Sequence, residues 1–170
     1  MDKPLARRGY GIQDAWRDVP AVRALACESR VTGVLREIFG RRPVPFQTLD
    51  FLRGTEHPAH SDAVHFDTIP RRFMCGARVA LEDIEEGSGP LEYYPGSHRL
   101  PTFAPYDLAV NGSGEDAYPA YERFLADLIE HEGLEVERFY PRKGQALVWA
   151  ASLLHGGGRS RIRRARGARR

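Results

Sequence analysis

Helical patterns occupy the first third of the chain. Asp18 is placed to cap a helix with Pro20 in its first turn, and Ser29 to begin a second helix that Gly40 ends. The second pattern has apolar residues at helical spacing, namely Val31, Val34, Leu35, Ile38 and Phe39. The spacing predicts two helices, the second with an apolar face that needs a partner.

Short runs typical of β-strands follow from Pro45 onwards. They cover residues 45–52, 73–81, 91–94, 134–140 and 145–150. A stretch rich in Gly, Pro and Ser precedes one more helical pattern, whose apolar positions are Tyr121, Phe124, Leu125, Leu128 and Ile129. This order predicts a mainly β fold with flanking helices, in which the strands form a sandwich or barrel and the late helix covers the sheet.

Composition places the chain among ordinary soluble domains, because its 170 residues are 42% hydrophobic and 28% charged. No apolar run approaches the roughly 20 residues that span a bilayer, and the first ten residues lack the apolar core of a secretory signal. Cys27 and Cys75 form no metal-binding or redox spacing. We therefore expect a cytoplasmic protein with no membrane partner.

The formal net charge of +2 conceals an uneven distribution. Residues 159–170 contain seven arginines, and the remaining chain carries 18 basic residues against 23 acidic ones. We expect residues 1–158 to form a single domain and 159–170 to be a solvated, disordered Arg-rich tail. Since the basic excess is terminal and lacks interleaved aromatic residues, nucleic acid is not expected as a partner. Anion or nucleic-acid binding through the tail, weakening steeply with salt, is a lower-ranked alternative.

The densest polar cluster lies at 57–67, where three histidines and two aspartates occur within eleven positions. In a strand, side chains two positions apart share a face, so His60 with Asp62, or His65 with Asp67, would present an imidazole and a carboxylate together. Two histidines and one carboxylate form the ligand set of non-haem Fe(II) oxygenases. Either pair is therefore two-thirds of a metal site.

A third ligand has to come from elsewhere in the chain. His98 follows a Pro-Gly-Ser turn, whereas His155 follows a β-type run and precedes three glycines that leave room for a close approach to the backbone. The second setting suits a ligand better, and we favour His155.

Several ordered segments together resemble the phytanoyl-CoA dioxygenase family. They are His60-Ser61-Asp62, the stretches 87–91 and 94–99, and the run 143–149 that leads to His155. The resemblance implies an Fe(II)- and 2-oxoglutarate-dependent dioxygenase on a double-stranded β-helix (jelly roll, cupin-like). Residues 1–158 would then be one oxygenase-like domain with N-terminal helices. The implied reaction hydroxylates a small-molecule substrate with O₂ and releases succinate and CO₂.

The resemblance also implies roles for particular residues. His60, Asp62 and His155 would be the catalytic centre and the iron ligands, and an arginine about eleven positions beyond His155, here Arg166, would bind the far carboxylate of 2-oxoglutarate. From its position before the polar cluster, Gln47 is a candidate for binding the substrate or cosubstrate by a hydrogen bond, or an ordinary sheet-facing amide.

The C-terminal sequence departs from the family pattern. Family members usually continue with Arg-x-Ser and another strand, whereas this chain reads Arg166-Gly167-Ala168. Relative to the family the C-terminus is altered or truncated, and the jelly roll is incomplete if no further strand follows. A truncated, catalytically silent member that retains only metal binding is the main alternative. An iron-free, metal-binding cupin-like protein that does not respond to 2-oxoglutarate is another alternative.

Overall fold

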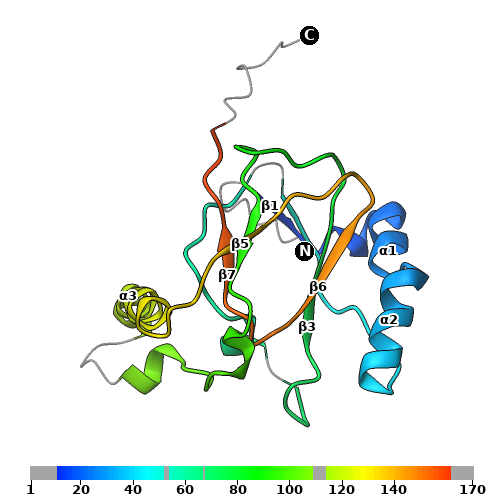
Figure 1. Ribbon diagram of the computed structural model, residues 1–170. Helices are drawn as coiled ribbons and strands as arrows, with labels where there is room; N and C mark the ends of the chain where they lie inside the picture. Colours follow the sequence, from blue (N-terminus) through cyan, green and yellow to red (C-terminus); the bar gives the residue numbers. More distant parts are fainter. Residues whose placement is uncertain (1–10, 52–53, 67, 109–113, 162–170) are drawn as a thin grey trace. The chain divides into compact units, whose positions relative to one another are not determined.

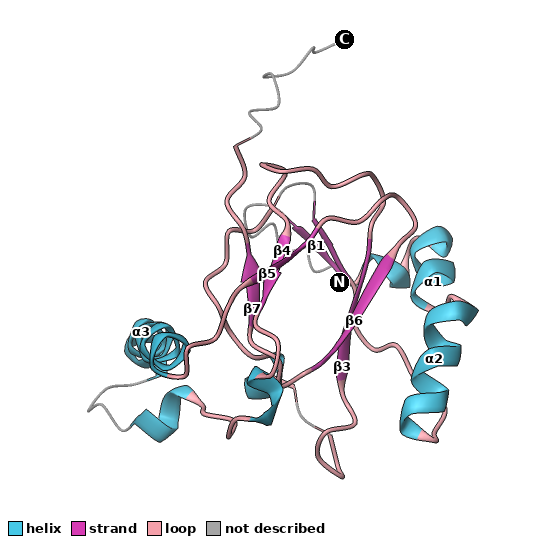
Figure 2. Cartoon of the chain, in the orientation of Figure 1, coloured by secondary structure: helices cyan, strands magenta, loops and turns pink. Residues whose placement is uncertain are grey.

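The computed structural model describes residues 11–51, 54–66, 68–108 and 114–161. The chain divides into two compact units, Met1–Gly54 and Thr55–Arg170. Figures 1 and 2 show the helices and strands of both. No helix in the described part of the chain has the length and apolar character needed to cross a membrane.

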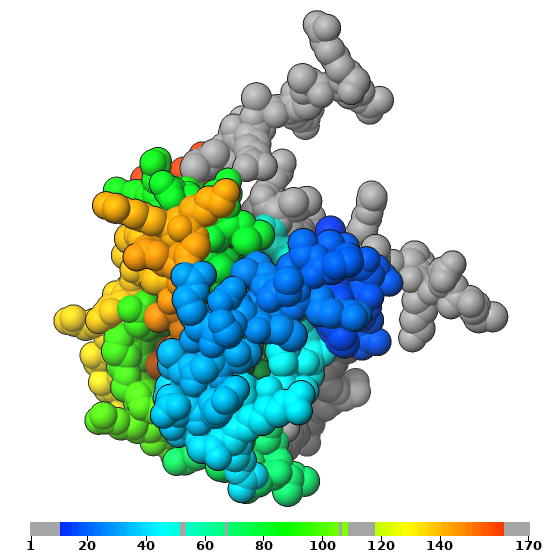
Figure 3. Space-filling model, turned by 90° about the vertical axis from the view of Figure 1, so that its right-hand side faces the viewer, coloured from blue at the N-terminus to red at the C-terminus, as the bar shows by residue number. Residues whose placement is uncertain are grey.

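The first unit contains a strand pair and two helices. Strand β1 (Gly11–Gln13) pairs antiparallel with β2 (Leu49–Phe51), with Gly11 opposite Phe51. A 3₁₀ turn at Ala15–Arg17 leads into α1 (Pro20–Ala26) and α2 (Ser29–Phe39). Figure 3 shows the exposed side of these helices in blue and cyan.

The helix boundaries confirm all but one of the sequence predictions. Helix α2 begins at Ser29 and ends before Gly40, whose φ of 60° suits glycine. Pro20 opens α1 as predicted, but the prediction of Asp18 as its cap is wrong because Val19 holds the cap position. The Asp18 amide instead donates to the Ala15 carbonyl and closes the preceding 3₁₀ turn.

The second unit contains two small antiparallel sheets. One pairs β3 (Cys75–Val79) with β6 (Ala146–Ala150). In the other, β4 (Leu91–Tyr93) lies between β5 (Glu137–Phe139) and β7 (His155–Gly157). The strands are shorter than the predicted runs, and the sequence pattern did not predict β7, which consists of His155 and two glycines.

The two sheets of this unit face each other through aromatic side chains. Trp149 of β6 lies 5.0 Å from His155 of β7 between ring centroids. The indole also covers Gly76 of β3, where an added Cβ would overlap it. The side of β3 and β6 that carries Gly76 and Trp149 is therefore the inner side.

Helix α3 (Gly114–His131) supplies most of the apolar core of this unit. Tyr121, Leu125 and Leu154 are buried together, and Phe124, Leu128 and Ile129 pack against them. This confirms the apolar stripe predicted for the helix. Burial raises the pKa of Tyr121 to about 12, so its hydroxyl stays neutral at physiological pH.

The structure confirms a β-rich fold with few helices. The described strands form separate small sheets, so closure into a jelly roll stays a prediction. Residues 159–161 of the expected tail are tied to the body of the second unit. The Arg161 amide donates to the Gly87 carbonyl, and the Ser160 amide donates to Glu56 Oε1. The remaining tail residues, 162–170, lie outside the described residues.

Replacing Leu125 with Ala should destabilise the second unit by about 2–5 kcal/mol, because Leu125 is buried in the α3 core. Equilibrium urea unfolding followed by circular dichroism measures the change. Glu130→Ala, at an exposed position of the same helix, is the matched control and should stay within about 0.5 kcal/mol of the parent. Equal stability of the Leu125 variant and the parent would contradict the assigned core.

Candidate metal centre

The structure brings three of the predicted site residues together. His60, Asp62 and His155 each offer one ligand atom, and these atoms lie within 4.8 Å of one another. His155 Nε2 is 3.6 Å from Asp62 Oδ2, and His60 Nε2 is 4.0 Å from Asp62 Oδ1. Such spacing is too long for hydrogen bonds and leaves room for a shared cation.

A reciprocal backbone pairing places the two histidines side by side. The His60 amide donates to the His155 carbonyl at 2.9 Å, and the His155 amide donates to the His60 carbonyl at 3.0 Å. The segment before His60 also runs close to β7, because Gly157 N donates to His57 O at 3.0 Å. A Cβ on Gly156 would lie 2.6 Å from the His57 carbonyl oxygen. The glycines after His155 thus allow the close approach that the sequence predicted, and the approaching group is the chain itself.

Asp62 reaches the site by a different geometry from the one predicted. The prediction that His60 and Asp62 share one strand face is wrong, because Asp62 begins a 3₁₀ turn, Asp62–Val64. Two hydrogen bonds hold this turn on the end of β6: Ser61 Oγ and the Ala63 amide both donate to the Ala151 carbonyl at 3.0 Å. The turn, and not a strand, directs the carboxylate toward the histidines.

Both imidazoles are anchored through their Nδ1 atoms. His60 Nδ1 lies 2.9 Å from the Pro58 carbonyl oxygen, and His155 Nδ1 lies 2.9 Å from the Leu153 carbonyl oxygen. Because a carbonyl only accepts, each Nδ1 carries a proton, and in the neutral form of the ring Nε2 presents its lone pair toward Asp62. Burial and the adjacent His155 lower the pKa of His60, which favours this neutral form.

Trp149 fixes the orientation of the carboxylate. Its Nε1–H donates to Asp62 Oδ2 at 3.2 Å. The sequence did not predict this contact, since 87 positions separate the two residues. Hydrogen bonds of this kind orient metal ligands and contribute to metal affinity.

Ser97, in the 3₁₀ turn Ser97–Arg99, positions the chain just before β7. Its buried hydroxyl donates to the Tyr94 carbonyl at 2.7 Å and accepts from the Leu154 amide at 2.9 Å. The turn therefore has a structural role, because it holds the backbone that leads into β7. The neighbouring His98 lies outside the cluster of ligand atoms, and its carbonyl accepts a long hydrogen bond from Ser152 Oγ.

The structure does not bring the other candidate residues to the triad, the cluster formed by His60, Asp62 and His155. His65 stacks on Tyr118 of α3, and its Nε2 lies 3.3 Å from the Tyr118 hydroxyl. Asp67 and Arg166 lie outside the described residues. Gln47 is half-buried in the first unit, two positions before β2, and its proposed contact with substrate or cosubstrate stays a prediction.

A hollow of about 780 Å³ lies on the opposite face of the β4–β5–β7 sheet. Glu92 and Arg138, which form an ion pair at 2.8 Å, line this hollow, and none of the three candidate ligands does. In the register of β4 with β7, Glu92 is opposite Gly156, whereas Tyr93 is opposite His155. The triad therefore belongs to the inner side of the sheet and not to this hollow.

The donor set fits a mononuclear metal site of the kind found in non-haem iron proteins. Two imidazoles and a carboxylate bring their ligand atoms together, and each side chain has a hydrogen bond that orients it. The chain belongs to the phytanoyl-CoA dioxygenase (PhyH) family, whose sequence model matches residues 11–167.

Solved structures with a similar fold include EctD from S. alaskensis with 2-oxoglutarate and 5-hydroxyectoine. It is 22% identical, with a TM-score of 0.66 over 88% of this chain and 50% of that one. The non-haem alpha-ketoglutarate-dependent carbocyclase SnoK from nogalamycin biosynthesis is 15% identical, with a TM-score of 0.65 over 88% of this chain and 57% of that one. The epimerase SnoN, solved with Fe³⁺ and alpha-ketoglutarate, is 19% identical, with a TM-score of 0.61 over 89% of this chain and 57% of that one.

The chain spans about half the length of these structures. No curated protein matches it.

Replacing Trp149 with Phe should weaken divalent metal binding about 10- to 100-fold, because the hydrogen bond from the indole N–H to Asp62 is lost. An aromatic side chain remains at the position. Titration with Co(II), followed by its visible absorption, measures the affinity. Trp16→Phe is the control, since Trp16 Nε1 donates to Asp14 in the first unit. Metal affinity unchanged in the Trp149 variant would show that the indole plays no part in the site.

Proposed function

We propose that the protein is an Fe(II)- and 2-oxoglutarate-dependent dioxygenase that hydroxylates a small-molecule substrate. The observation that carries this proposal is the convergence of two histidine Nε2 atoms on one carboxylate. Membership of the phytanoyl-CoA dioxygenase family supports it. So do the similar folds of EctD, solved with bound Fe and with 2-oxoglutarate, and of SnoN, solved with Fe³⁺ and alpha-ketoglutarate.

With Fe(II) and 2-oxoglutarate bound, such a centre uses O₂ to convert a substrate C–H bond to C–OH, while 2-oxoglutarate loses CO₂ and becomes succinate. The protein's own residues bind and orient. His60 and His155 present neutral imidazoles, and Asp62 supplies one negative charge against the two positive charges of the metal. A ligand set confined to one side of a metal leaves the other positions open for cosubstrate and oxygen.

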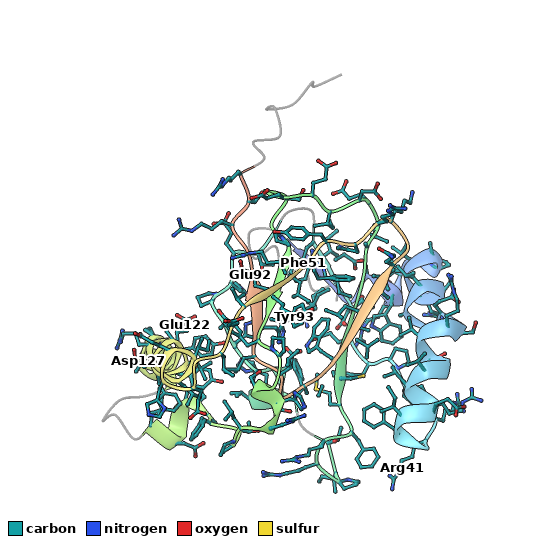
Figure 4. The ribbon with its side chains drawn as sticks, viewed as in Figure 1. Arg41, Phe51, Glu92, Tyr93, Glu122 and Asp127 are labelled. Atoms are coloured by element: carbon teal, nitrogen blue, oxygen red, sulfur yellow. The ribbon has the colours of Figure 1, made fainter. Side chains whose placement is uncertain are left out.

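Tyr93 and Glu137 give the inner face beside the triad a polar surface for the substrate. Tyr93 lies opposite both His155 and Glu137 in the sheet, and its hydroxyl donates to Glu137 Oε2 at 2.7 Å. Figure 4 shows Tyr93 between the two sheets. The hydrogen bond with Glu137 raises the pKa of Tyr93, which keeps its hydroxyl protonated as a donor. We assign this pair to orienting the substrate near the metal.

The structural neighbours carry out different reactions on this fold, since SnoK is a carbocyclase and SnoN an epimerase. Because these reactions differ, the neighbours do not determine the reaction class, and hydroxylation is our own proposal. We define the substrate only as a small molecule. The cytoplasmic location and the absence of a nucleic-acid partner stay predictions.

The proposal is tested by an anaerobic titration with Fe(II) and then 2-oxoglutarate, followed by the visible charge-transfer band of the chelate. The band should appear with the parent protein and be lost in His60→Ala and Asp62→Ala, which each remove a ligand. His65→Ala is the matched control, since this histidine of the same sequence cluster stacks on Tyr118. It should keep the band.

Admitting O₂ after the titration should then produce succinate in the parent and not in Asp62→Ala. Iron binding without the band would instead favour the metal-binding, catalytically silent member of the family. A band that persists in Asp62→Ala would refute the assigned ligand set.

A further inference from the structure

Buried polar side chains gather at the segments that carry the candidate metal ligands. Among the residues that the structure describes, the buried polar or charged side chains, tyrosine aside, are His155, Ser61 and Ser97. Ser61 directly precedes Asp62. Ser97 accepts a hydrogen bond from the amide of Leu154, which directly precedes His155. Each serine therefore belongs to the packing around one ligand-bearing segment.

Tyr121 of α3 contributes a third buried hydroxyl. The residue is 1% exposed, and within the described part of the chain its hydroxyl has no hydrogen-bond partner. Burial raises the pKa of Tyr121, and the Ser61 backbone lowers it by a smaller amount, so this backbone lies beside the phenolic oxygen. Most buried polar groups are hydrogen-bonded, because an unpaired one has lost its contact with solvent without compensation. The Tyr121 hydroxyl thus indicates a bound group.

A small cavity joins the three hydroxyl-bearing residues. Ser61, Ser97 and Tyr121 all line it, together with apolar side chains such as Leu125 and Leu154, and its volume is about 10 Å³. A buried water molecule needs roughly this volume and makes about two to four hydrogen bonds. The cavity therefore has the size and the polar lining of a site for a single water.

The hydrogen-bond inventory of the cavity matches a water molecule. Ser61 Oγ donates its proton to the Ala151 carbonyl at 3.0 Å, and Ser97 Oγ donates its proton to the Tyr94 carbonyl at 2.7 Å. Both serine oxygens keep an acceptor position, whereas the Tyr121 hydroxyl has a proton without an acceptor. A water that accepts from Tyr121 and donates to both serines would satisfy all of these groups.

We propose that this cavity binds one water molecule, through which Tyr121 positions the two segments that carry Asp62 and His155. Tyr121 is then a positioning residue of the metal centre, because it acts through the two serines and not on the ligand atoms. The inference rests on metal binding at the triad, which the proposed function also requires. Loss of the Tyr121 hydroxyl would loosen both segments at once, since water-mediated hydrogen bonds fix geometry much as direct ones do.

Apolar packing gives α3 a second contact with the same turn. Val64, the last residue of the 3₁₀ turn that Asp62 begins, packs against the cluster of Tyr121, Leu125 and Leu154. These apolar contacts remain when the hydroxyl alone is removed. A Tyr121→Phe substitution therefore tests the water and not the core.

The first test is titration of Tyr121→Phe with Co(II), followed by its visible absorption. The variant should bind Co(II) about 10-fold more weakly, and the band of bound Co(II) should shift, because the ligands are less well oriented. Tyr118→Phe is the matched control, since it removes a hydroxyl from the same helix that lies beside His65. It should keep the affinity and the band of the parent. Equal effects of both substitutions, or no effect of either, would overturn the proposal.

A third variant separates positioning from the stability of the helix. Ile129→Ala truncates a side chain that packs on the same core but does not line the cavity. It should lower the midpoint of urea unfolding of the metal-free protein and leave the Co(II) affinity unchanged. Tyr121→Phe should show the reverse pattern, because it keeps the ring that packs in the core. If Co(II) affinity instead falls with the urea midpoint in both variants, loosening of α3 is the cause and the proposal fails.

The water itself is observable in a crystal structure of the parent protein. It should lie within hydrogen-bonding distance of the hydroxyl oxygens of Tyr121, Ser61 and Ser97, and it should be lost or displaced in Tyr121→Phe. A dry cavity in the parent would rule the proposal out, whatever the titrations give.

The outcomes separate this inference from the proposed function. Weaker Co(II) binding by Tyr121→Phe, in a protein that gives no charge-transfer band with Fe(II) and 2-oxoglutarate, would support the positioning role and contradict the oxygenase assignment. A normal band in the parent, with no effect of Tyr121→Phe on Co(II) binding, would do the opposite. A parent that binds neither Co(II) nor Fe(II) would overturn both.

Discussion

The reciprocal hydrogen bonds between the backbones of His60 and His155 are the constraint on which the candidate metal centre depends. They fix two residues from distant parts of the sequence as directly opposed neighbours, with ring centroids 4.5 Å apart. Gly156 and Gly157 make this pairing compatible with the close passage of the segment before His60. Since the carbonyls of Pro58 and Leu153 then orient the rings, backbone geometry determines most of the ligand arrangement.

Charge and hydrogen bonding explain why this arrangement favours a cation. Two imidazole Nε2 atoms lie about 4 Å or less from one carboxylate, and such a cluster of acceptor atoms is stabilised when a positive ion enters. Trp149 donates to the carboxylate without neutralising it. The second unit thus holds the imidazoles through their Nδ1 atoms and the carboxylate through Oδ2, and these contacts leave both Nε2 atoms and Asp62 Oδ1 available to a cation.

The sequence pointed to the three residues that the structure brings together, but not to the geometry that joins them. Helix α3 and the five predicted β-type runs follow local apolar periodicity, which sequence reveals directly. The 3₁₀ turn at Asp62 depends on hydrogen bonds to Ala151, and the role of Trp149 depends on a contact across the chain. Long-range pairing has no local sequence signal, so these features had to come from the structure.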